Sequence, residues 1–244
     1  MKPYAFLFLF FFTAEISIAQ LQMTFPSKDG VTITADWYPV NSESETILLC
    51  HQNGFSRGEY IETAKKMNML GFNCLAIDQR AGKAVNGIEN ETAKDAHAKG
   101  KTASPLNSEQ DIAAAVDWLF EKYNRRVILL GSSYSASLAL KVAMENNHVF
   151  AVAAFSPGEY FDEKNFISKS ITGLRKPVFL TSSKEEAPAV TELTKDVMSL
   201  VKIQFIPKGA GDHGSKVLWN KNSENQDYWA ALVSFLNRMK KENE

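Results

Sequence analysis

The chain has 244 residues, of which 27 are Lys or Arg and 28 are Asp or Glu, so its formal net charge is −1. Without an excess of positive charge, the composition gives no reason to expect nucleic acid or an acidic membrane surface as a partner. The two cysteines are too few for a disulfide-stapled fold and lack the spacing of a zinc site, so a hydrophobic core must hold the protein together.

The N-terminus has the pattern of a secretory signal peptide that covers the first 19 residues. Lys2 supplies a positive charge, residues 5–12 form an apolar run too short to span a bilayer, and small residues stand at Ser17 and Ala19. We expect cleavage before Gln20, and therefore a secreted or periplasmic protein with no stable membrane insertion afterwards. A retained membrane anchor is the alternative, although no positively charged stop-transfer flank follows the apolar run.

Residues 20–244 fit a single domain in which short apolar runs alternate with longer amphipathic stretches. This alternation is typical of βαβ units and predicts an α/β fold, a mostly parallel sheet flanked by helices on both faces. The expected strands are 22–25 and 31–38, which form an antiparallel hairpin, and then 46–50, 72–77, 127–130, 150–155, 177–181 and 201–206. The expected helices are 59–70, 108–123, 135–144 and a C-terminal helix that includes Trp229 and Leu236.

Two stretches interrupt this alternation and are expected to be irregular. Residues 80–106 are polar without a sustained apolar period, and residues 158–175 contain Tyr160, so either stretch could cover a pocket. The sequence from Ser108 to Asp111 follows the first stretch and has the pattern of a capping box at the start of a helix.

Residues 131–135, Gly-Ser-Ser-Tyr-Ser, lie where a buried strand turns directly into a buried helix. This is the setting of a nucleophile elbow, whose tight turn tolerates only small residues two positions on either side of the nucleophile. Gly131 and Ser135 are small, although Ser135 stands where glycine is usual. The pattern predicts Ser133 as a nucleophile, and the alternative is an ordinary loop whose serines cap the helix.

A serine hydroxyl needs a base within hydrogen-bond reach and a third group that orients the base. His213 is the best base, because its glycine-rich loop follows the last strand and so lies at the carboxyl edge, where open α/β sheets place their sites. His97 and His148 are expected to be solvated or structural.

The acid should come between nucleophile and histidine along the chain, after the strand 177–181. Glu185 and Glu186 both follow that strand. Asp212 is a weaker candidate, because it is adjacent to His213 and badly placed to reach Nδ1 of the imidazole.

Two backbone N–H groups should stabilise the developing oxyanion. We expect the first from Tyr134, which follows the nucleophile at the helix N-terminus. For the second we favour the amide of Asn53, in the loop after strand 46–50, over that of its neighbour Gln52. His51 would then be structural and fix this loop by hydrogen bonds.

The motifs resemble the α/β-hydrolase superfamily, in particular its small dienelactone-hydrolase-like and esterase/lipase-like members, over essentially the whole mature chain. The resemblance rests on residues 51–54 (His-Gln-Asn-Gly), where relatives carry a His-Gly oxyanion loop, on residues 78–80 (Asp-Gln-Arg), where they carry Asp-x-Arg, and on the triad positions. It implies an α/β-hydrolase fold and Glu186 as the acid, because the acid of relatives falls nine positions after a proline like Pro177. We also expect Asp78 and Arg80 to form a structural salt bridge.

The sequence therefore predicts a serine hydrolase that cleaves a small or medium acyl ester through an acyl-enzyme on Ser133, with Glu186 and His213 in the triad and no metal or organic cofactor. A peptidase or lactonase with the same triad and a hydrolase-fold binding protein without turnover are the alternatives. Cys50 and Cys74 lie in strands that could be neighbours, so both a disulfide and two buried thiols remain open.

Overall fold

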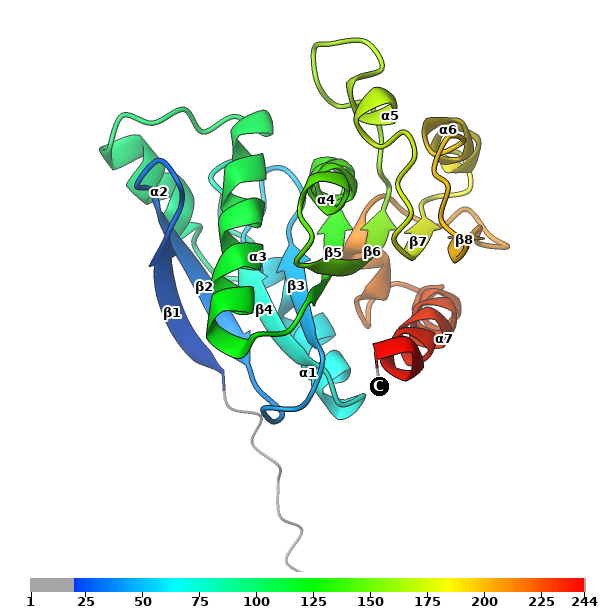
Figure 1. Ribbon diagram of the computed structural model, residues 1–244, viewed down its shortest axis with the longest axis horizontal. Coiled ribbons are helices and arrows are strands. Elements are labelled where there is room, and N and C mark those ends of the chain that lie inside the picture. Colours follow the sequence, from blue (N-terminus) through cyan, green and yellow to red (C-terminus); the bar gives the residue numbers. More distant parts are fainter. Residues whose placement is uncertain (1–19, 244) are drawn as a thin grey trace, which may run out of the picture.

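A computed structural model describes residues 20–243 of the chain (Figure 1). The predicted signal peptide, residues 1–19, lies outside the described residues, so its cleavage stays a prediction. No helix within residues 20–243 is both long and apolar enough to cross a membrane.

Eight strands form one sheet in the order β1-β2-β4-β3-β5-β6-β7-β8. The first two form the predicted antiparallel hairpin, β2 also pairs antiparallel with β4, and the remaining pairs are parallel. The strands are β1 (Leu21–Pro26), β2 (Thr32–Tyr38), β3 (Thr46–Cys50), β4 (Asn73–Ile77), β5 (Val127–Ser132), β6 (Val149–Phe155), β7 (Val178–Thr181) and β8 (Lys202–Phe205). The strands β3 to β7 of the parallel part are buried on both faces, and for this reason they occur in the sequence as continuous apolar runs.

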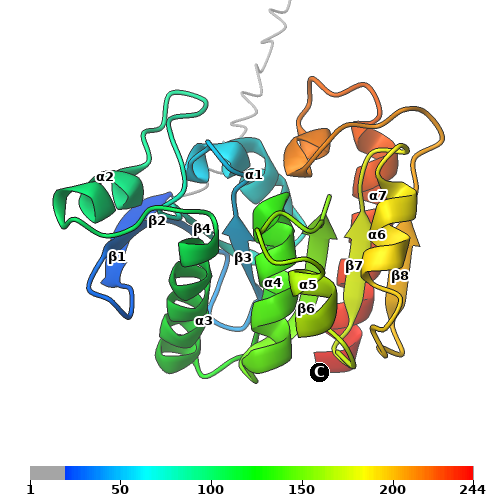
Figure 2. The same cartoon turned by 90° about the horizontal axis from the view of Figure 1, so that it is seen from above.

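Helices cover both faces of the sheet, as Figure 2 shows. One core joins the sheet to α3, α4, α5 and α6, and a second core on the opposite face joins it to α1 and α7. The α-helices are α1 (Ile61–Met69), α2 (Glu91–Ala98), α3 (Glu109–Tyr123), α4 (Tyr134–Glu145), α5 (Phe166–Ser170), α6 (Ala187–Leu193) and α7 (Asn225–Asn243). Short 3-10 helices are formed by Arg57–Tyr60, Leu106–Ser108 and Ser215–Leu218. The predicted α/β-hydrolase architecture is confirmed.

The two cysteines are free thiols, buried in different cores. Cys74 of β4 lies opposite Ile47 of β3, three positions away from Cys50 along that strand. Three positions correspond to about 10 Å along a strand, beyond the Cα separation of about 7 Å that a disulfide can bridge. The question that the sequence left open is therefore answered in favour of two buried thiols.

The expectation of a loop throughout residues 80–106 was wrong, because residues 91–98 form helix α2. Asn90 caps this helix by accepting a hydrogen bond from the N–H of Ala93. The helix packs on β2 largely through polar contacts, in which Thr92 and Asp95 accept hydrogen bonds from the backbone of β2. A helix held in this way needs few apolar residues, so it leaves little apolar periodicity in the sequence.

The predicted salt bridge between Asp78 and Arg80 does not form. Asp78 pairs instead with Arg57, whose guanidinium lies 2.6 Å from the carboxylate. Arg80 is paired with Asp111 at 2.7 Å and with Asp29 at 2.8 Å. Both charges are buried and need partners, as the sequence argument required, but they find them in other elements.

The capping box predicted at Ser108 is also absent, because the Ser108 side chain makes no capping hydrogen bond. Ser108 has helical backbone angles and its hydroxyl accepts a hydrogen bond from Tyr134, while the carboxylate of Asp111 accepts hydrogen bonds from the backbone and side chain of Arg80. A buried arginine thus takes the acidic group that a capping box would have used.

Candidate active site

Ser133, Glu186 and His213 each lie in a loop that follows a parallel strand, after β5, β7 and β8 respectively. The carboxyl ends of neighbouring parallel strands meet at one edge of the sheet, where folds of this class place their sites. Residues separated by up to 80 positions in the sequence therefore come together.

Ser133 occupies the strained turn predicted for it, with φ 60° and ψ −127°, directly before helix α4. Its N–H donates to the carbonyl of Phe155 at 2.8 Å, which anchors the turn to strand β6. At Gly131 a side chain would collide with the backbone of Ser135 and Ala136, so glycine is required there. The side chain of Ser133 is held close to the sheet edge and only 9% of the residue is exposed.

The three predicted triad residues form a continuous chain of hydrogen bonds. Nε2 of His213 lies 2.8 Å from Oγ of Ser133, and Nδ1 lies 2.5 Å from Oε1 of Glu186. Because the Glu186 carboxylate accepts a hydrogen bond from Nδ1–H, the ring proton stays on Nδ1, and the Nε2 atom of the neutral imidazole is free to accept the serine proton. The geometry is that of a nucleophile, a base and an orienting acid.

Glu186 is held as a carboxylate by several donors. Its Oε2 atom accepts hydrogen bonds from the hydroxyl of Ser156 at 2.8 Å, and from the N–H and hydroxyl of Ser183 at 3.1 and 3.0 Å. Burial by itself raises the pKa of Glu186, but the hydrogen bonds from His213, Ser156 and Ser183 outweigh it and lower the pKa to about 2. The acid is therefore charged at any ordinary assay pH.

The other two candidates for the acid do not reach the imidazole. Glu185 is exposed, and none of its described contacts is with His213. Asp212 accepts a hydrogen bond from the backbone N–H of His213 and pairs with Lys216, so it supports the loop and not Nδ1.

Neither of the two predicted oxyanion donors has a competing acceptor within residues 20–243. Tyr134 is the first residue of α4, where backbone N–H groups have no partner within the helix. The N–H of Gln52 donates to the buried carboxylate of Glu59 at 2.8 Å and so faces the protein interior. The N–H of Asn53 has no acceptor among the described residues, and this difference favours Asn53 over Gln52.

His51 is structural, as expected, and fixes the start of the oxyanion loop. Its Nδ1 lies 2.8 Å from the carbonyl of Gln52, and its Nε2 accepts the N–H of Gln79 at 2.9 Å. Burial lowers the pKa of His51 to about 4. The ring is therefore neutral and donates from Nδ1 while accepting at Nε2.

Ser135, which replaces the usual glycine of the elbow, has a clear structural use. Its hydroxyl donates to the carbonyl of His51 at 2.5 Å and accepts from the side-chain amide of Gln79 at the same distance. The extra side chain thus ties the nucleophile elbow to the oxyanion loop.

Two residues next to the triad were not assigned a role from the sequence. Ser156, at φ 53° directly after β6, donates to Glu186 and accepts the N–H of Gly214 at 3.0 Å. The hydroxyl of Tyr160 donates a hydrogen bond to the carbonyl of Ser156 at 2.7 Å. The ring of Tyr160 packs edge-on against the imidazole of His213, with 6.4 Å between the two ring centroids. Burial raises the pKa of Tyr160 and outweighs the opposite effect of the Ser133 hydroxyl, so that the net pKa is about 12.

A sequence signal existed for only one of these two residues. Ser156 follows a strand at the carboxyl edge, as the triad residues do, and could have been found by that rule. Tyr160 lies deeper in the stretch 158–175, which was expected to be irregular but contains helix α5, and nothing in the spacing of Tyr160 marks it.

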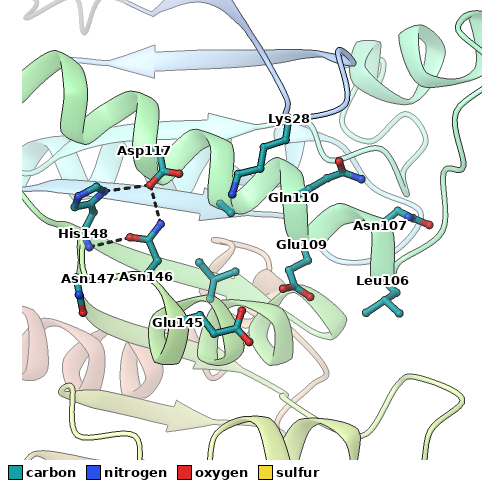
Figure 3. Close-up of a pocket in the computed structure, with 12 residues that line it drawn as sticks. Lys28, Leu106, Asn107, Glu109, Gln110, Asp117, Glu145, Asn146, Asn147 and His148 are labelled. Carbon is teal, nitrogen blue, oxygen red and sulfur yellow. Dashed lines mark hydrogen bonds and ion pairs between the residues drawn. The ribbon is translucent and has the colours of Figure 1, made fainter.

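Among the hollows on the surface of the described residues, two are large. An open one of about 910 Å³ borders the triad on the side of the acid and is lined by Ser183, Lys184, Glu185, Glu186, Ala210, Gly211, Asp212 and His213. The other, a groove of about 620 Å³ lined by residues of α3 and α4 and by the segments next to these helices, contains Asp117, which contacts His148 and Asn146 (Figure 3). The groove shares no residue with the triad, so the first hollow is the one relevant to the site.

No protein-family model matches the sequence, and no curated protein matches it significantly. Solved structures are nevertheless similar in fold. An esterase of Pyrococcus furiosus superimposes with a TM-score of 0.66 at 20% identity, covering 91% of this chain and 93% of the esterase. A dienelactone hydrolase of Anabaena variabilis gives a TM-score of 0.68 at 16% identity, covering 90% of this chain and 97% of the hydrolase. An esterase domain of a Rhodothermus marinus protein gives a TM-score of 0.60 at 15% identity, covering 91% of this chain and 98% of the esterase domain. The chain therefore has the α/β-hydrolase fold, of the type found in dienelactone hydrolase and small esterases.

Proposed function

We propose that the protein is a serine hydrolase that cleaves a small or medium acyl ester through an acyl-enzyme on Ser133. The observation that carries this proposal is the hydrogen-bonded chain from Ser133 Oγ through His213 to Glu186, with distances of 2.8 and 2.5 Å. Esterases and a dienelactone hydrolase among the structures of the same fold support the choice of an acyl substrate.

In the proposed reaction His213 Nε2 takes the proton of the Ser133 hydroxyl while Oγ attacks the carbonyl carbon of the ester. The electron pair of the C=O bond moves to the carbonyl oxygen, which the N–H groups of Tyr134 and Asn53 stabilise as an oxyanion. When this intermediate collapses, the ester C–O bond breaks and His213 returns the proton to the departing alkoxide.

Water then attacks the acyl-enzyme by the same steps and releases a carboxylic acid. Glu186 keeps its charge throughout and stabilises the imidazolium of His213 that forms in each half of the reaction. The residues needed for both halves are the same, so loss of the base should abolish acylation as well as turnover.

Covalent labelling of purified residues 20–244 with a fluorophosphonate probe tests the proposal. The probe reacts with an activated serine and not with an ordinary hydroxyl. We expect the label on the peptide that contains Ser133, and we expect Ser133→Ala and His213→Ala to abolish it. His97→Ala is the matched control, because His97 is an exposed histidine on α2 and should leave labelling unchanged. Well-folded protein that takes no label would instead favour a binding protein of the same fold.

The acyl chemistry of esters, lactones and peptides is shared, so substrate class needs a second measurement. Hydrolysis of p-nitrophenyl esters of increasing chain length, beside a lactone and a p-nitroanilide of the same acyl group, separates the three. We expect the short and medium esters to be turned over fastest, and preference for the anilide or the lactone would replace the esterase proposal by one of its alternatives.

We further propose that the mature protein begins at Gln20 after export. Intact-mass or N-terminal analysis of protein recovered from outside the cytoplasm tests this directly. Retention of the first nineteen residues would support a membrane anchor.

A further inference from the structure

Glu59 is a buried acidic residue that the proposed reaction does not use. It lies in the 3-10 helix Arg57–Tyr60, directly before α1, and is only 1% exposed. One carboxylate oxygen accepts the N–H of Gln52 in the oxyanion loop at 2.8 Å. The other accepts the hydroxyl of Ser215 at 2.6 Å. The carboxylate therefore joins the oxyanion loop to the segment that follows His213.

The partners of this carboxylate are hydrogen-bond donors and not a cation. Within residues 20–243, no Lys, Arg or His forms an ion pair with Glu59 at the distances seen for the buried pairs of Arg57 and Arg80. Burial raises the pKa of Glu59, while the hydrogen bonds from Ser215, Gln52 and Ser132 and the positive charge of Lys216, which forms no ion pair with it within the described residues, lower the pKa. A buried acid without a direct ion pair is costly, so the hydrogen bonds from the oxyanion loop and from Ser215 are what hold the carboxylate in place.

The Gln52 N–H belongs to the peptide plane that joins His51 to Gln52, and both polar groups of this plane are held. Its N–H is bound by Glu59, and its carbonyl accepts the Ser135 hydroxyl at 2.5 Å. Since the N–H and C=O of a trans peptide point in opposite directions, these two contacts fix the rotation of the plane.

The next peptide plane joins Gln52 to Asn53. Its carbonyl accepts from Nδ1 of His51 at 2.8 Å and from the N–H of Phe55 at 3.2 Å. The N–H of Asn53 must therefore point the opposite way, where it has no acceptor among the described residues. Glu59 fixes the first plane, and through the first plane it fixes the starting orientation of the second.

The histidine loop is tied to the same group. Ser215, whose hydroxyl binds Glu59, comes two residues after His213. Its N–H donates at 2.8 Å to the hydroxyl of Ser132, the residue before the nucleophile. Glu59, Ser215 and Ser132 thus connect the oxyanion loop, the base and the nucleophile elbow through buried hydrogen bonds.

From these contacts we propose that Glu59 is a positioning residue that holds the Asn53 amide and the His213 loop in their places relative to Ser133. This inference rests on the proposed hydrolase function. It predicts that loss of the carboxylate lowers the rate of the chemical step without weakening ground-state binding, because the oxyanion exists only in the transition state and the intermediate.

The test compares kcat and KM for p-nitrophenyl acetate, the rate of fluorophosphonate labelling, and Tm in four variants of the mature chain. Glu59→Ala removes both links, and Glu59→Gln keeps one acceptor in place. Glu62→Gln is the matched control, because Glu62 also accepts a backbone N–H, that of Asn220 at 2.8 Å, and makes no described hydrogen bond to the oxyanion loop. Asn68→Ala breaks the buried bonds of Asn68 to the carbonyls of Tyr38 and Phe72, and serves as a control for lost stability.

We expect Glu59→Ala to lower kcat and the labelling rate about 10- to 100-fold with KM changed less than about threefold, since a displaced oxyanion donor costs up to about 100- to 1,000-fold. Glu59→Gln should lie between Glu59→Ala and the wild type. Glu62→Gln should keep wild-type kinetics, and Asn68→Ala should lower Tm while keeping kcat.

Three results decide the matter. If kcat of Glu59→Ala stays within about twofold of the wild type, or falls only as much as that of an equally destabilised Asn68→Ala, the positioning role is overturned while the hydrolase function stands. If Glu59→Ala does not fold, Glu59→Gln decides alone, because an unchanged kcat at wild-type Tm refutes the role and a lowered kcat supports it. A wild-type protein that neither labels nor turns over ester overturns the hydrolase proposal and this inference together.

Discussion

The hydrogen bonds around Glu186 lead to a specific prediction for its amide analogue. Oε1 faces Nδ1 of His213, whereas Oε2 accepts three hydrogen bonds from Ser156 and Ser183. In Glu186→Gln one of the two oxygens becomes an NH₂ group, which can only donate. Three donors on the Oε2 side exclude the NH₂ from that position, so it must face His213.

An NH₂ group beside Nδ1 selects the wrong tautomer of His213. Nδ1 then accepts a hydrogen bond, and the ring proton moves to Nε2, where it faces Ser133 and blocks removal of the serine proton. The amide analogue of the acid in a serine triad lowers kcat about 10⁴-fold, which corresponds to about 5 kcal/mol at the transition state. We therefore expect a loss of this order in Glu186→Gln, although the variant keeps the size and shape of the native side chain.

Steady-state hydrolysis of p-nitrophenyl acetate and the rate of fluorophosphonate labelling measure this loss. Glu185→Gln is the matched control, because Glu185 is the exposed neighbour and should retain wild-type rates. Glu186→Ala should lose about as much as Glu186→Gln, since removal of the acid from a triad is itself costly. A Glu186→Gln protein that keeps activity within about tenfold of the wild type would refute the argument that the three donors orient the amide.

Three further predictions concern the residues that support the site. Burial lowers the pKa of His51 to about 4, whereas an imidazole in the unfolded chain has a pKa of about 6.5. Between these two values only the unfolded chain binds the extra proton. The free energy of unfolding is therefore highest above this pH window and falls as the pH falls through it. The neutral His51 ring should lower the free energy of unfolding by about 2 kcal/mol when the pH falls from about 7 to about 5. Denaturant unfolding should therefore depend more steeply on pH in the wild type than in His51→Gln. Equal slopes would contradict the burial of a neutral ring. Ser135→Gly should lower the free energy of unfolding by about 1–3 kcal/mol in urea titrations, because the buried carbonyl of His51 and the side-chain amide of Gln79 lose a hydrogen-bond partner. An unchanged urea midpoint would show that these hydrogen bonds contribute nothing to stability. Ser156→Ala should lower kcat about tenfold, or about 1.4 kcal/mol, with KM unchanged in ester assays, because Glu186 loses a donor, whereas an effect on KM alone would place Ser156 in substrate binding.

The fold and the three residues of the candidate triad could be predicted from the sequence for the same physical reason. Each central strand is buried on both faces and so appears as a continuous apolar run, and the residues that follow such runs gather at one edge of the sheet. Ser133 and His213 were predicted in this way, Ser133 with the added support of the elbow pattern in residues 131–135. The choice of Glu186 over Glu185 needed the resemblance, because spacing after a strand does not fix which of two adjacent carboxylates turns inward.

What the sequence did not reveal depends on pairing between distant polar groups. Asp78 and Arg80 stand two residues apart and invite a pairing that the fold does not make, because Arg57 lies closer to Asp78 in space. Glu59 follows no strand and belongs to no motif, so its role in joining two loops is visible only when the loops are placed. Helix α2 was missed because its contacts with β2 are polar.

Two of the three departures from the usual motifs, Gln52 and Ser135, are better understood together than singly; the third is Glu186 in place of aspartate. Glycines at these positions would leave the oxyanion loop and the elbow free of side-chain contacts. Here the hydroxyl of Ser135 holds the carbonyl of the peptide whose N–H, that of Gln52, is held by Glu59. The side-chain oxygen of Gln52 is buried near Gly214, the residue after His213, and accepts no hydrogen bond within the described residues, so the bonds in question are those of the backbone and of Ser135. Flexibility that glycine would bring to the oxyanion loop is replaced by a fixed set of buried bonds, so variants at Ser135 and Glu59 should show non-additive effects on kcat.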